Sequence, residues 1–463
     1  MIKFGTDGWR AKIADEFTFE NLKIVAKATA NYLLKSTDKK IVAIGYDNRF
    51  LSEFFAFEAA KVIEASGFKV FLTKHSCPTP ALSLATKQMN AACGIMITAS
   101  HNPAEWNGYK VKTSDGCSAP IDVTSKIEDE VSKLLKNSKT TLDQNSNINL
   151  FDIKIEYFKW VSKLVNIDVI SKAKLTVVFD PMFGSSIGYL DNILSSGKIE
   201  VETINGERNP LFGGINPEPL QKNAEKTIAY IKDQKINKCA GIVLDGDGDR
   251  IAAIDENGNF INSHYVFAIL LKHLVENRKM SGIVVKTFNI TKLIDKLCKK
   301  YGLELLEKPI GFKNIAELML NSDILIGGEE SGGFGIKGHI PERDGTLNGL
   351  LLLECMAMTG KTLGEIIEEL NKEFGQYFYD RYDSIIENPN DKILNLKRSP
   401  PTYFAGKKIT AIEDMDGIKF VFEDAAWILF RASGTEPLLR IYCEAKSKQT
   451  INDLLSYGNS LIK

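Results

Sequence analysis

Residues 40–73 read KIVAIGYDNRFLSEFFAFEAAKVIEASGFKVFLT, and this stretch decides the fold class. Two short apolar runs, at 41–46 and 68–73, flank a longer segment whose apolar positions recur at helical spacing and which ends at Gly67. The pattern predicts a strand, a helix and a second strand, and the run AACGIMITAS at 91–100 predicts a third strand. Apolar strands that alternate with helices are typical of parallel sheets covered on both faces, so we expect an α/β fold.

The same alternation recurs further along the chain, with predicted strands at 174–180, 240–245, 281–288 and 323–328. Near Phe374 the pattern changes, and residues 407–445 alternate as antiparallel strands do before a helix follows. The polar segment 137–152 predicts a linker. A chain of 463 residues is long enough for several domains. We predict three α/β domains and a smaller α+β domain, over residues 1–150, 151–255, 256–375 and 376–463.

The composition is that of a globular protein in water, with 44% hydrophobic and 25% charged residues. A net charge of −1 creates no overall field that attracts nucleic acid or an anionic membrane, so we expect neither as a partner. The seven cysteines show no CxxC spacing, which indicates a reducing compartment. Because the N-terminus lacks an apolar signal core and no apolar run is long enough to span a membrane, we expect a cytoplasmic location.

The segment DGDGDR, residues 245–250, places Asp245, Asp247 and Asp249 at alternate positions between two apolar runs. In an extended segment alternate side chains point to one side, and carboxylates gathered there repel each other unless a hard cation lies among them. We therefore predict a Mg²⁺ site, with an acidic turn as the alternative. A calcium loop is excluded because Arg250 stands at the sixth position, where that loop requires glycine.

The third predicted strand runs into the polar sequence SHNP, which puts Ser100 where α/β folds place ligands. The surrounding pattern is not the GxSxG of hydrolases, but Ser100 could be a covalent acceptor, with a helix or turn cap as the alternative. His101 could be its base or could order the loop, and Lys110 could carry a proton or bind phosphate. Arg10 and Arg49 each follow a turn or strand and would hold phosphoryl oxygens if they lie near Ser100.

Two glycine-rich segments predict binding loops. GGEESGGFGIKG, residues 327–338, contains GxGxxG, but no helix pattern follows, so a dinucleotide site is not favoured. We interpret it as a loop that binds sugar hydroxyls through Glu329 and Ser331, with a plain glycine-rich turn as the alternative. RASGTEP, residues 431–437, offers a guanidinium, two hydroxyls and backbone N–H groups, which suit a phosphate dianion unless the segment is an ordinary turn. The candidates there are Arg431, Ser433, Gly434 and Thr435.

Five segments in order, namely GTDGWR (5–10), TASHNPAEWNGYK (98–110), DGDGDR (245–250), GEESGG (328–333) and RASGTEP (431–437), resemble the motifs of the α-D-phosphohexomutase family. The resemblance extends nearly from end to end. It implies three similar domains with mixed α/β sheets and a C-terminal α+β domain, arranged around a central cleft. It also implies Mg²⁺ as cofactor, a hexose 1,6-bisphosphate as activator and small hexose phosphates as partners.

The resemblance assigns a role to each candidate residue. Ser100 would carry the phosphoryl group and would bind Mg²⁺ together with Asp245, Asp247 and Asp249. Lys110 and Arg250 would lie beside the transferring group, with Arg10 and His101 supporting the serine loop. The remaining residues would contact substrate: Glu329, Ser331 and Lys313 at the sugar, and Arg431, Ser433, Gly434 and Thr435 at the phosphate that is not being transferred.

The implied enzyme is an isomerase that interconverts hexose 1-phosphate and hexose 6-phosphate, as a monomer or homodimer. The segment GEESGGFGIKGHIPERDG resembles glucose-type members, so we expect glucose phosphate as the preferred substrate and mannose phosphate as a second one. Some relatives carry a sugar-contacting histidine where Gly333 stands, and His339 or Arg343 is expected to replace it. The alternatives are a phosphoglucosamine mutase, a Mg²⁺-dependent phosphatase and a sugar-phosphate-binding protein without catalysis.

Overall fold

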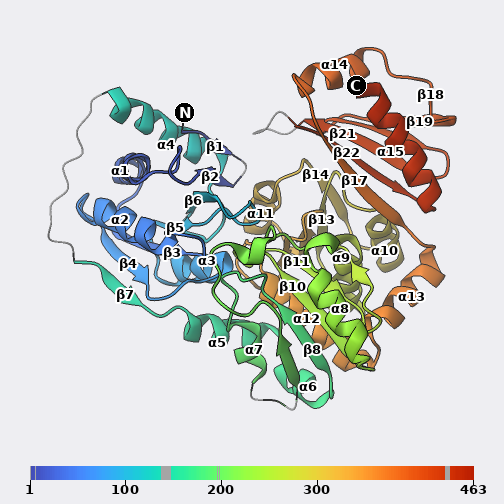
Figure 1. Cartoon of the computed structure of the whole chain (residues 1–463), viewed down its shortest axis with the longest axis horizontal. Coiled ribbons are helices and arrows are strands. Elements are labelled where there is room, and N and C mark those ends of the chain that lie inside the picture. The colour runs from blue at the N-terminus through green and yellow to red at the C-terminus, as the bar shows by residue number, and fades with distance from the viewer. Residues whose placement is uncertain are drawn as a thin grey trace.

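The computed structural model describes residues 2–5, 7–136, 147–195, 197, 199–432 and 438–462. Four sheets follow one another along the chain, each with its own helices (Figure 1). The N-terminal domain lies at the opposite side of the molecule from the C-terminal domain, and the second and third domains lie between them (Figure 1). The predicted architecture of three mixed α/β domains and a C-terminal domain is confirmed, while the chain boundaries at residues 150, 255 and 375 stay predictions.

The first domain contains a seven-stranded sheet in the order β1-β2-β6-β5-β3-β4-β7. Its strands are β1 (Phe4–Gly5), β2 (Gly8–Lys12), β3 (Ile41–Tyr46), β4 (Lys69–Thr73), β5 (Cys93–Ile97), β6 (Trp106–Lys112) and β7 (Asn149–Phe151). Its helices are α1 (Phe19–Ser36), α2 (Ser52–Glu64), α3 (Thr79–Gln88) and α4 (Ile121–Lys136). Within the segment 137–152, predicted as a linker, β7 instead pairs with β4 as an edge strand, and the Phe151 ring contacts Phe71.

The second domain has a five-stranded sheet in the order β12-β11-β10-β8-β9. Its strands are β8 (Thr176–Asp180), β9 (Glu200–Thr203), β10 (Cys239–Leu244), β11 (Ile251–Ile254) and β12 (Phe260–Ile261). Its helices are α5 (Lys154–Leu164), α6 (Ile167–Lys172), α7 (Leu190–Leu194) and α8 (Glu225–Gln234), with 3₁₀ turns η1 (Phe212–Gly214) and η2 (Gln221–Asn223).

The third domain has a four-stranded sheet in the order β14-β13-β15-β16. Its strands are β13 (Ile283–Thr287), β14 (Leu305–Lys308), β15 (Ile324–Gly328) and β16 (Phe334–Ile336). Its helices are α9 (Ser263–Lys272), which continues into the π-helical turn η3 (His273–Asn277), α10 (Leu293–Tyr301), α11 (Phe312–Asn321), α12 (Gly345–Thr359) and α13 (Leu363–Phe374).

The C-terminal domain has a six-stranded antiparallel sheet in the order β17-β22-β21-β20-β19-β18. Its strands are β17 (Phe378–Ile385), β18 (Tyr403–Phe404), β19 (Lys407–Glu413), β20 (Ile418–Phe422), β21 (Trp427–Ala432) and β22 (Leu438–Ala445), and its helices are α14 (Pro389–Arg398) and α15 (Lys448–Ile462). Within the described part of the chain, no helix combines the length and apolarity needed to cross a bilayer.

The first three sheets share one departure from the purely parallel arrangement that the strand–helix alternation predicts. In each, a parallel strand is followed by a neighbour that returns antiparallel: β5 by β6, β10 by β11, and β15 by β16. Such a return needs only a short connection, whereas a parallel crossover needs a helix. The three connections, residues 98–105, 245–250 and 329–333, carry parts of the sequence motifs, so equivalent loops of three domains hold many of the candidate site residues.

The second and third domains share one continuous hydrophobic core. Helix α12 is apolar nearly all round, which is typical of a helix buried on every side. It packs on β10 and β11 of the second domain and on α9 of the third, and Gly349 lets it approach Ile242 closely. This shared packing fixes the 245–250 loop relative to the 329–333 loop.

The C-terminal domain has a separate core and meets the third domain through a small cluster of Phe288, Ile310, Trp427 and neighbouring apolar residues. Polar contacts support this junction: Glu444 Oε1 accepts from the backbone N–H of Lys292 at 3.0 Å and from the Trp427 indole at 3.1 Å. His264 on α9 also lies here, with its ring centroid 4.2 Å from that of Tyr379 on β17.

His264 gives this junction a pH dependence. Its Nδ1 accepts a hydrogen bond from the backbone N–H of Thr291 at 3.0 Å, and burial lowers the pKa of His264 to about 4. The pKa of a histidine in the unfolded chain is about 6.5. Between about pH 6.5 and about pH 4 the unfolded state therefore binds the proton more readily than the folded state does, so the free energy of unfolding falls as the pH falls. We expect His264 to lower the free energy of unfolding by about 3 kcal/mol at pH 4, relative to pH 7.

Urea unfolding of wild type and His264→Asn at pH 7 and pH 4.5 measures this contribution. The amide oxygen of asparagine can accept the Thr291 hydrogen bond without titrating, so the variant should lose less stability on acidification than wild type does. His75→Asn, at an exposed site, is the control and should follow wild type. Equal losses in wild type and His264→Asn would remove His264 as the cause.

Candidate active site

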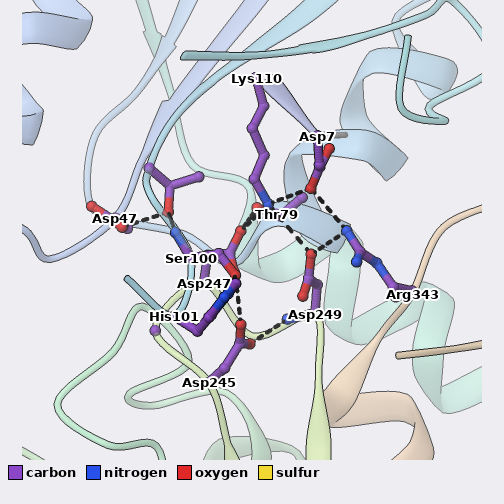
Figure 2. Close-up of polar contacts among 12 residues, drawn as sticks. Asp7, Asp47, Thr79, Ser100, His101, Lys110, Asp245, Asp247, Asp249 and Arg343 are labelled. Atoms are coloured by element: carbon purple, nitrogen blue, oxygen red, sulfur yellow. Dashed lines mark hydrogen bonds and ion pairs between the residues drawn. The ribbon is translucent and has the colours of Figure 1, made fainter. Parts of the chain in front are cut away.

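The serine loop begins where β5 ends in the middle of the first sheet. Ser100 is 1% exposed and has a positive φ of 53°, which is uncommon for a residue other than glycine and is concentrated at functional sites. Its backbone N–H donates to Thr98 Oγ1 at 2.9 Å, and its hydroxyl donates to Asp245 Oδ2 of the second domain at 2.8 Å (Figure 2). The structure therefore joins the predicted acceptor serine to the predicted metal loop.

Arg49 holds this loop by its backbone. The guanidinium is fully buried and donates to four carbonyl oxygens, at distances of 2.5 to 3.1 Å, of the residues Ser100, Asn102, Pro103 and Trp106. Asp47 pairs with its Nε at 3.1 Å. The expectation that Arg49 holds phosphoryl oxygens is wrong, because its four terminal donors are already engaged by the loop.

The 245–250 segment brings its carboxylates together by a turn and not by the extended geometry that was predicted. Gly248 has φ +72°, and Asp245 Oδ1 accepts from the backbone N–H groups of Asp249 and Arg250 at 3.0 and 3.1 Å. One carboxylate oxygen from each of Asp245, Asp247 and Asp249 lies within 4.8 Å of the others. The predicted convergence is confirmed even though the predicted backbone was wrong.

The donor set fits a hard divalent cation. All three aspartates are completely buried, and among the described residues Asp247 Oδ1 and Asp249 Oδ1 have no hydrogen-bond partner. Burial, followed by repulsion from Asp247 and Asp249, raises the pKa of Asp245 well above its usual value. Buried carboxylates in this arrangement are stable when a cation lies among them, and oxygen ligands are those that Mg²⁺ prefers.

Two cations from other domains already compensate part of this charge (Figure 2). Lys110 on β6 is 1% exposed, and its Nζ lies 2.8 Å from Asp7, 2.7 Å from Asp247 and 3.4 Å from Asp249. Burial alone would lower the pKa of Lys110, but these three carboxylates raise it above its usual value. Lys110 is therefore a protonated partner of the carboxylates. Arg343, from the segment before α12, contacts Asp249 at 2.6 Å.

His101 and Arg10 lie beside the serine. The Nδ1 atom of His101 is 3.4 Å from Ser100 Oγ, and Arg10 Nη1 donates to the Asn102 side chain at 2.9 Å. Burial, together with nearby arginines that include Arg250 and Arg10, lowers the pKa of His101 well below its usual value, so the ring is neutral at pH 7. The prediction that Arg10 lies at the serine loop agrees with this contact.

The 329–333 loop lies against the metal loop through the backbone, because the N–H of Ile251 donates to Gly332 O at 2.9 Å. Glu329 is 6% exposed, and burial raises its pKa although Arg343 opposes this. Ser331 has a buried hydroxyl without a partner in the described residues. Lys313 lies half-buried in the first turn of α11.

Of the two residues expected to replace a histidine at 333, only Arg343 lies at this loop, 3.5 Å from Glu329. His339 is engaged elsewhere: its Nδ1 accepts from the Trp160 indole at 3.0 Å, and its Nε2 lies 3.1 Å from Asp344. These contacts place His339 at the N-terminus of α12 as a packing residue, so the expectation for His339 is wrong.

The C-terminal candidates are placed only in part. Arg431 is the penultimate residue of β21 and donates from Nε to Asp416 Oδ1 of its own domain at 3.0 Å. Ser433, Gly434 and Thr435 lie outside the described residues. Arg440 on β22 is among the positive groups that lower the pKa of His101, so the charge of this domain reaches the serine loop.

Sequence reasoning missed two residues that complete the carboxylate network. Asp7 lies in the quoted GTDGWR segment, where only the arginine was given a role, and it pairs with Lys110 and Arg343. Thr79 begins α3 with no motif to mark it. Its hydroxyl donates to Asp247 Oδ2 at 2.5 Å and its N–H to Asp247 O at 2.8 Å.

Thr79 is expected to orient Asp247 for the cation. Thr79→Val keeps the side-chain shape and removes the hydroxyl donor, which should raise the Kd for Mg²⁺ by about tenfold, as loss of a partner to a metal ligand typically does. Isothermal titration calorimetry measures this Kd. Thr79→Ser should retain the wild-type affinity.

The matched control is Thr86→Val in the same helix, where the buried hydroxyl donates to Leu82 O at 2.8 Å, within α3 itself. It should leave the Kd for Mg²⁺ unchanged. If Thr79→Val and Thr86→Val bind Mg²⁺ equally well, Thr79 has no role in orienting the metal loop.

Comparison with known proteins identifies the family. Four domain descriptions of "Phosphoglucomutase/phosphomannomutase" match residues 1–138 (domain I), 155–258 (domain II), 262–374 (domain III) and 394–456 (C-terminal domain).

A phosphoglucomutase/phosphomannomutase of Thermococcus kodakarensis is 30% identical over 99% of this chain and 98% of its own length. A phosphoglucosamine mutase of Methanococcus maripaludis (strain C5) is 31% identical over 100% and 98%. The crystal structure of a proposed phosphomannomutase of Thermus thermophilus matches with a TM-score of 0.88 and 36% identity, over 100% of this chain and 99% of that one. The chain belongs to the phosphoglucomutase/phosphomannomutase family and is an isomerase of the phosphohexomutase type.

Proposed function

We propose that this enzyme interconverts hexose 1-phosphate and hexose 6-phosphate through a phosphoserine at Ser100 and a hexose 1,6-bisphosphate intermediate. The observation that carries the proposal is the 2.8 Å hydrogen bond from the Ser100 hydroxyl to Asp245, at a carboxylate cluster in which two buried oxygens accept no hydrogen bond from the described residues. A serine in this position lies beside a cation site, in a loop whose backbone is fixed. That combination suits a phosphoryl acceptor, since such sites work mainly by positioning and charge stabilisation.

Each residue contributes one part of this chemistry. Asp245, Asp247 and Asp249 would hold Mg²⁺, with an oxygen on Ser100 as a further ligand. The bound cation would supply positive charge beside the transferring phosphoryl group. Arg250 would add positive charge at the same point, since its Nε lies 3.7 Å from Asp249 Oδ1. Neutral His101 and Arg10 keep the serine loop in position.

In the first transfer the bond between Ser100 Oγ and phosphorus breaks, and a bond from the free sugar hydroxyl to phosphorus forms. The sugar hydroxyl loses a proton and the departing serine oxygen gains one. The bisphosphate then turns over, and its other phosphoryl group returns to Ser100 by the reverse chemistry. Protonated Lys110 fits the acid role, as the donor to the departing oxygen. Hexose 1,6-bisphosphate as activator follows from the same scheme, since it phosphorylates an unmodified Ser100.

The remaining candidates would bind the substrate. Glu329, Ser331 and Lys313 would contact the sugar. Two observations support this assignment: the Ser331 hydroxyl has no hydrogen-bond partner in the part of the chain that the structure describes, and the Glu329 carboxylate is buried. Arg431, Ser433, Gly434 and Thr435 would hold the phosphate that is not transferred. In the sequence they run from the end of β21 toward β22, and the motifs of the other three domains likewise follow one strand and precede the next.

Glucose phosphate is our proposed main substrate and mannose phosphate the second. Glucosamine phosphate is the alternative, favoured by relatives that carry that name at similar identity. We further propose a cytoplasmic location, which agrees with seven cysteines that are all free and buried, and a monomer or homodimer as the working form.

Phosphorus NMR tests the activity directly. The protein would be incubated with Mg²⁺, catalytic glucose 1,6-bisphosphate and, in separate samples, the 1-phosphates of glucose, mannose and glucosamine. Conversion to the 6-phosphate without inorganic phosphate would support a mutase, and the relative rates would rank the sugars. Release of inorganic phosphate alone would make the protein a phosphatase, and no conversion of any sugar would overturn the proposal.

Ser100→Ala should abolish conversion while the fold is retained, because no oxygen remains to accept the phosphoryl group. The loss should exceed about a thousandfold. Ser83→Ala is the control: Ser83 is a buried serine in α3 whose hydroxyl has no partner within the described residues, and its loss should change little. Near-normal turnover in Ser100→Ala would eliminate the phosphoserine mechanism.

A further inference from the structure

We propose that Arg343 is a positioning residue that holds the 329–333 loop (the sugar loop) against the 245–250 loop (the metal loop). Residue 333 is glycine, on this proposal, because the Arg343 side chain occupies the space that a Cβ would need. The inference rests on the proposed function, since it concerns how that site is assembled. It assigns a role to two residues that neither bind the cation nor undergo chemistry.

The guanidinium of Arg343 contacts three different segments, and Figure 2 shows its contacts with Asp7 and Asp249. Its Nη2 lies 2.6 Å from Asp249 of the metal loop and 2.9 Å from Asp7 of the first domain. Its Nη1 lies 3.5 Å from Glu329 of the sugar loop. The side chain is 5% exposed, so solvent screens these ion pairs weakly. One side chain thus restrains a candidate metal ligand and a candidate sugar ligand at the same time.

An arginine suits this task better than a lysine. A planar guanidinium presents separate N–H donors in fixed directions, so it can contact the carboxylates of Asp249 and Glu329 through different nitrogens. A lysine carries its charge on one nitrogen. Arg343 pairs with Asp249 Oδ2, while Asp249 Oδ1 accepts no hydrogen bond from the described residues and has Arg250 Nε at 3.7 Å, so it is free to bind a cation directly.

Gly333 is needed for clearance and not for a turn. Its φ lies outside the left-handed range, so its backbone would accept an L-residue without strain. A Cβ at this position, however, would lie 2.2 Å from Arg343 Cδ and 2.8 Å from Arg343 Cγ. The middle of the arginine side chain would have to move away, and its guanidinium would leave Asp249 and Glu329. Because that side chain can move as a whole, an alanine here should displace Arg343 without unfolding the domain.

A double-mutant cycle tests this coupling. Gly333→Ala and Arg343→Ala should each raise the Kd for Mg²⁺, measured calorimetrically without sugar, and the KM for hexose phosphate, both by about tenfold. In the Arg343→Ala background, adding Gly333→Ala should change either quantity by less than about twofold, because the side chain that it displaces is already absent. Effects that multiply independently would overturn the inference.

Arg343→Lys provides a second test that creates no large cavity. It should also weaken Mg²⁺ binding, since a single ammonium cannot hold both loops. Wild-type affinity in this variant would contradict the need for the forked contact, even if Gly333→Ala failed to fold.

Two controls separate positioning from general destabilisation. Gly364→Ala also places a Cβ against a charged side chain, Glu256 Oε1 at 2.5 Å, but lies beyond the far end of β11 from the metal loop. Arg278→Ala removes another arginine of the third domain, one that donates to Leu164 O at 2.7 Å. Both should leave the Kd for Mg²⁺ and the KM unchanged.

The outcomes also separate this inference from the proposed function. If wild type converts no hexose phosphate, the proposed function fails, while the cycle in the Kd for Mg²⁺ still tests the coupling. If wild type is an active mutase and the two substitutions act independently, only the coupling fails.

Discussion

Three carboxylates from one tight loop are buried within 4.8 Å of each other, and the rest of the site follows from their mutual repulsion. Burial of unpaired charge is costly, so the fold must bring compensating groups to this point. Lys110 comes from the first domain and Arg343 from the third, while the aspartates belong to the second. Both compensating cations are present only when the three domains are assembled, which links formation of the site to packing of these domains.

That packing differs across the molecule. The second and third domains share a core around α12, and backbone hydrogen bonds join their motif loops, including one from Gly345 N to Gly248 O at 3.0 Å. The C-terminal domain has its own core and a smaller apolar junction with the third domain. The metal loop and the sugar loop thus form one rigid unit, whereas the segment proposed to bind the second phosphate belongs to a separately packed body.

The sequence was informative where short-range patterns decide the structure. Apolar runs predicted the central strands β3, β4, β5, β8 and β10, and the motif order predicted the four-domain family. The sequence was misleading where pairing with a neighbouring strand decides the structure. The antiparallel return of β6 after β5 depends on pairing that an apolar run does not specify, and β7 was hidden in a polar segment because an edge strand needs few apolar residues.

The site shows the same division. The three aspartates between apolar runs predicted a cation site, whereas Ser100 was only a candidate acceptor by its position after a buried strand, and its role came from the family resemblance. The turn that brings those aspartates together was not foreseen, because Gly248 permits a left-handed backbone that an alternating pattern does not reveal. Thr79 could not have been found, since its partner lies 168 residues away and an isolated threonine before a proline carries no signal of its own.

The contacts of Arg49 have a consequence for how the serine loop can vary. Arg49 grips the loop through carbonyl oxygens, which every amino acid possesses. The path of the chain from Ser100 to Trp106 is thus largely independent of the side chains along it. Substitutions within this stretch can alter charge or shape beside the serine while the backbone keeps its course. Arg49 itself lies far from the motif in sequence, and the loop keeps this path only while Arg49 is retained.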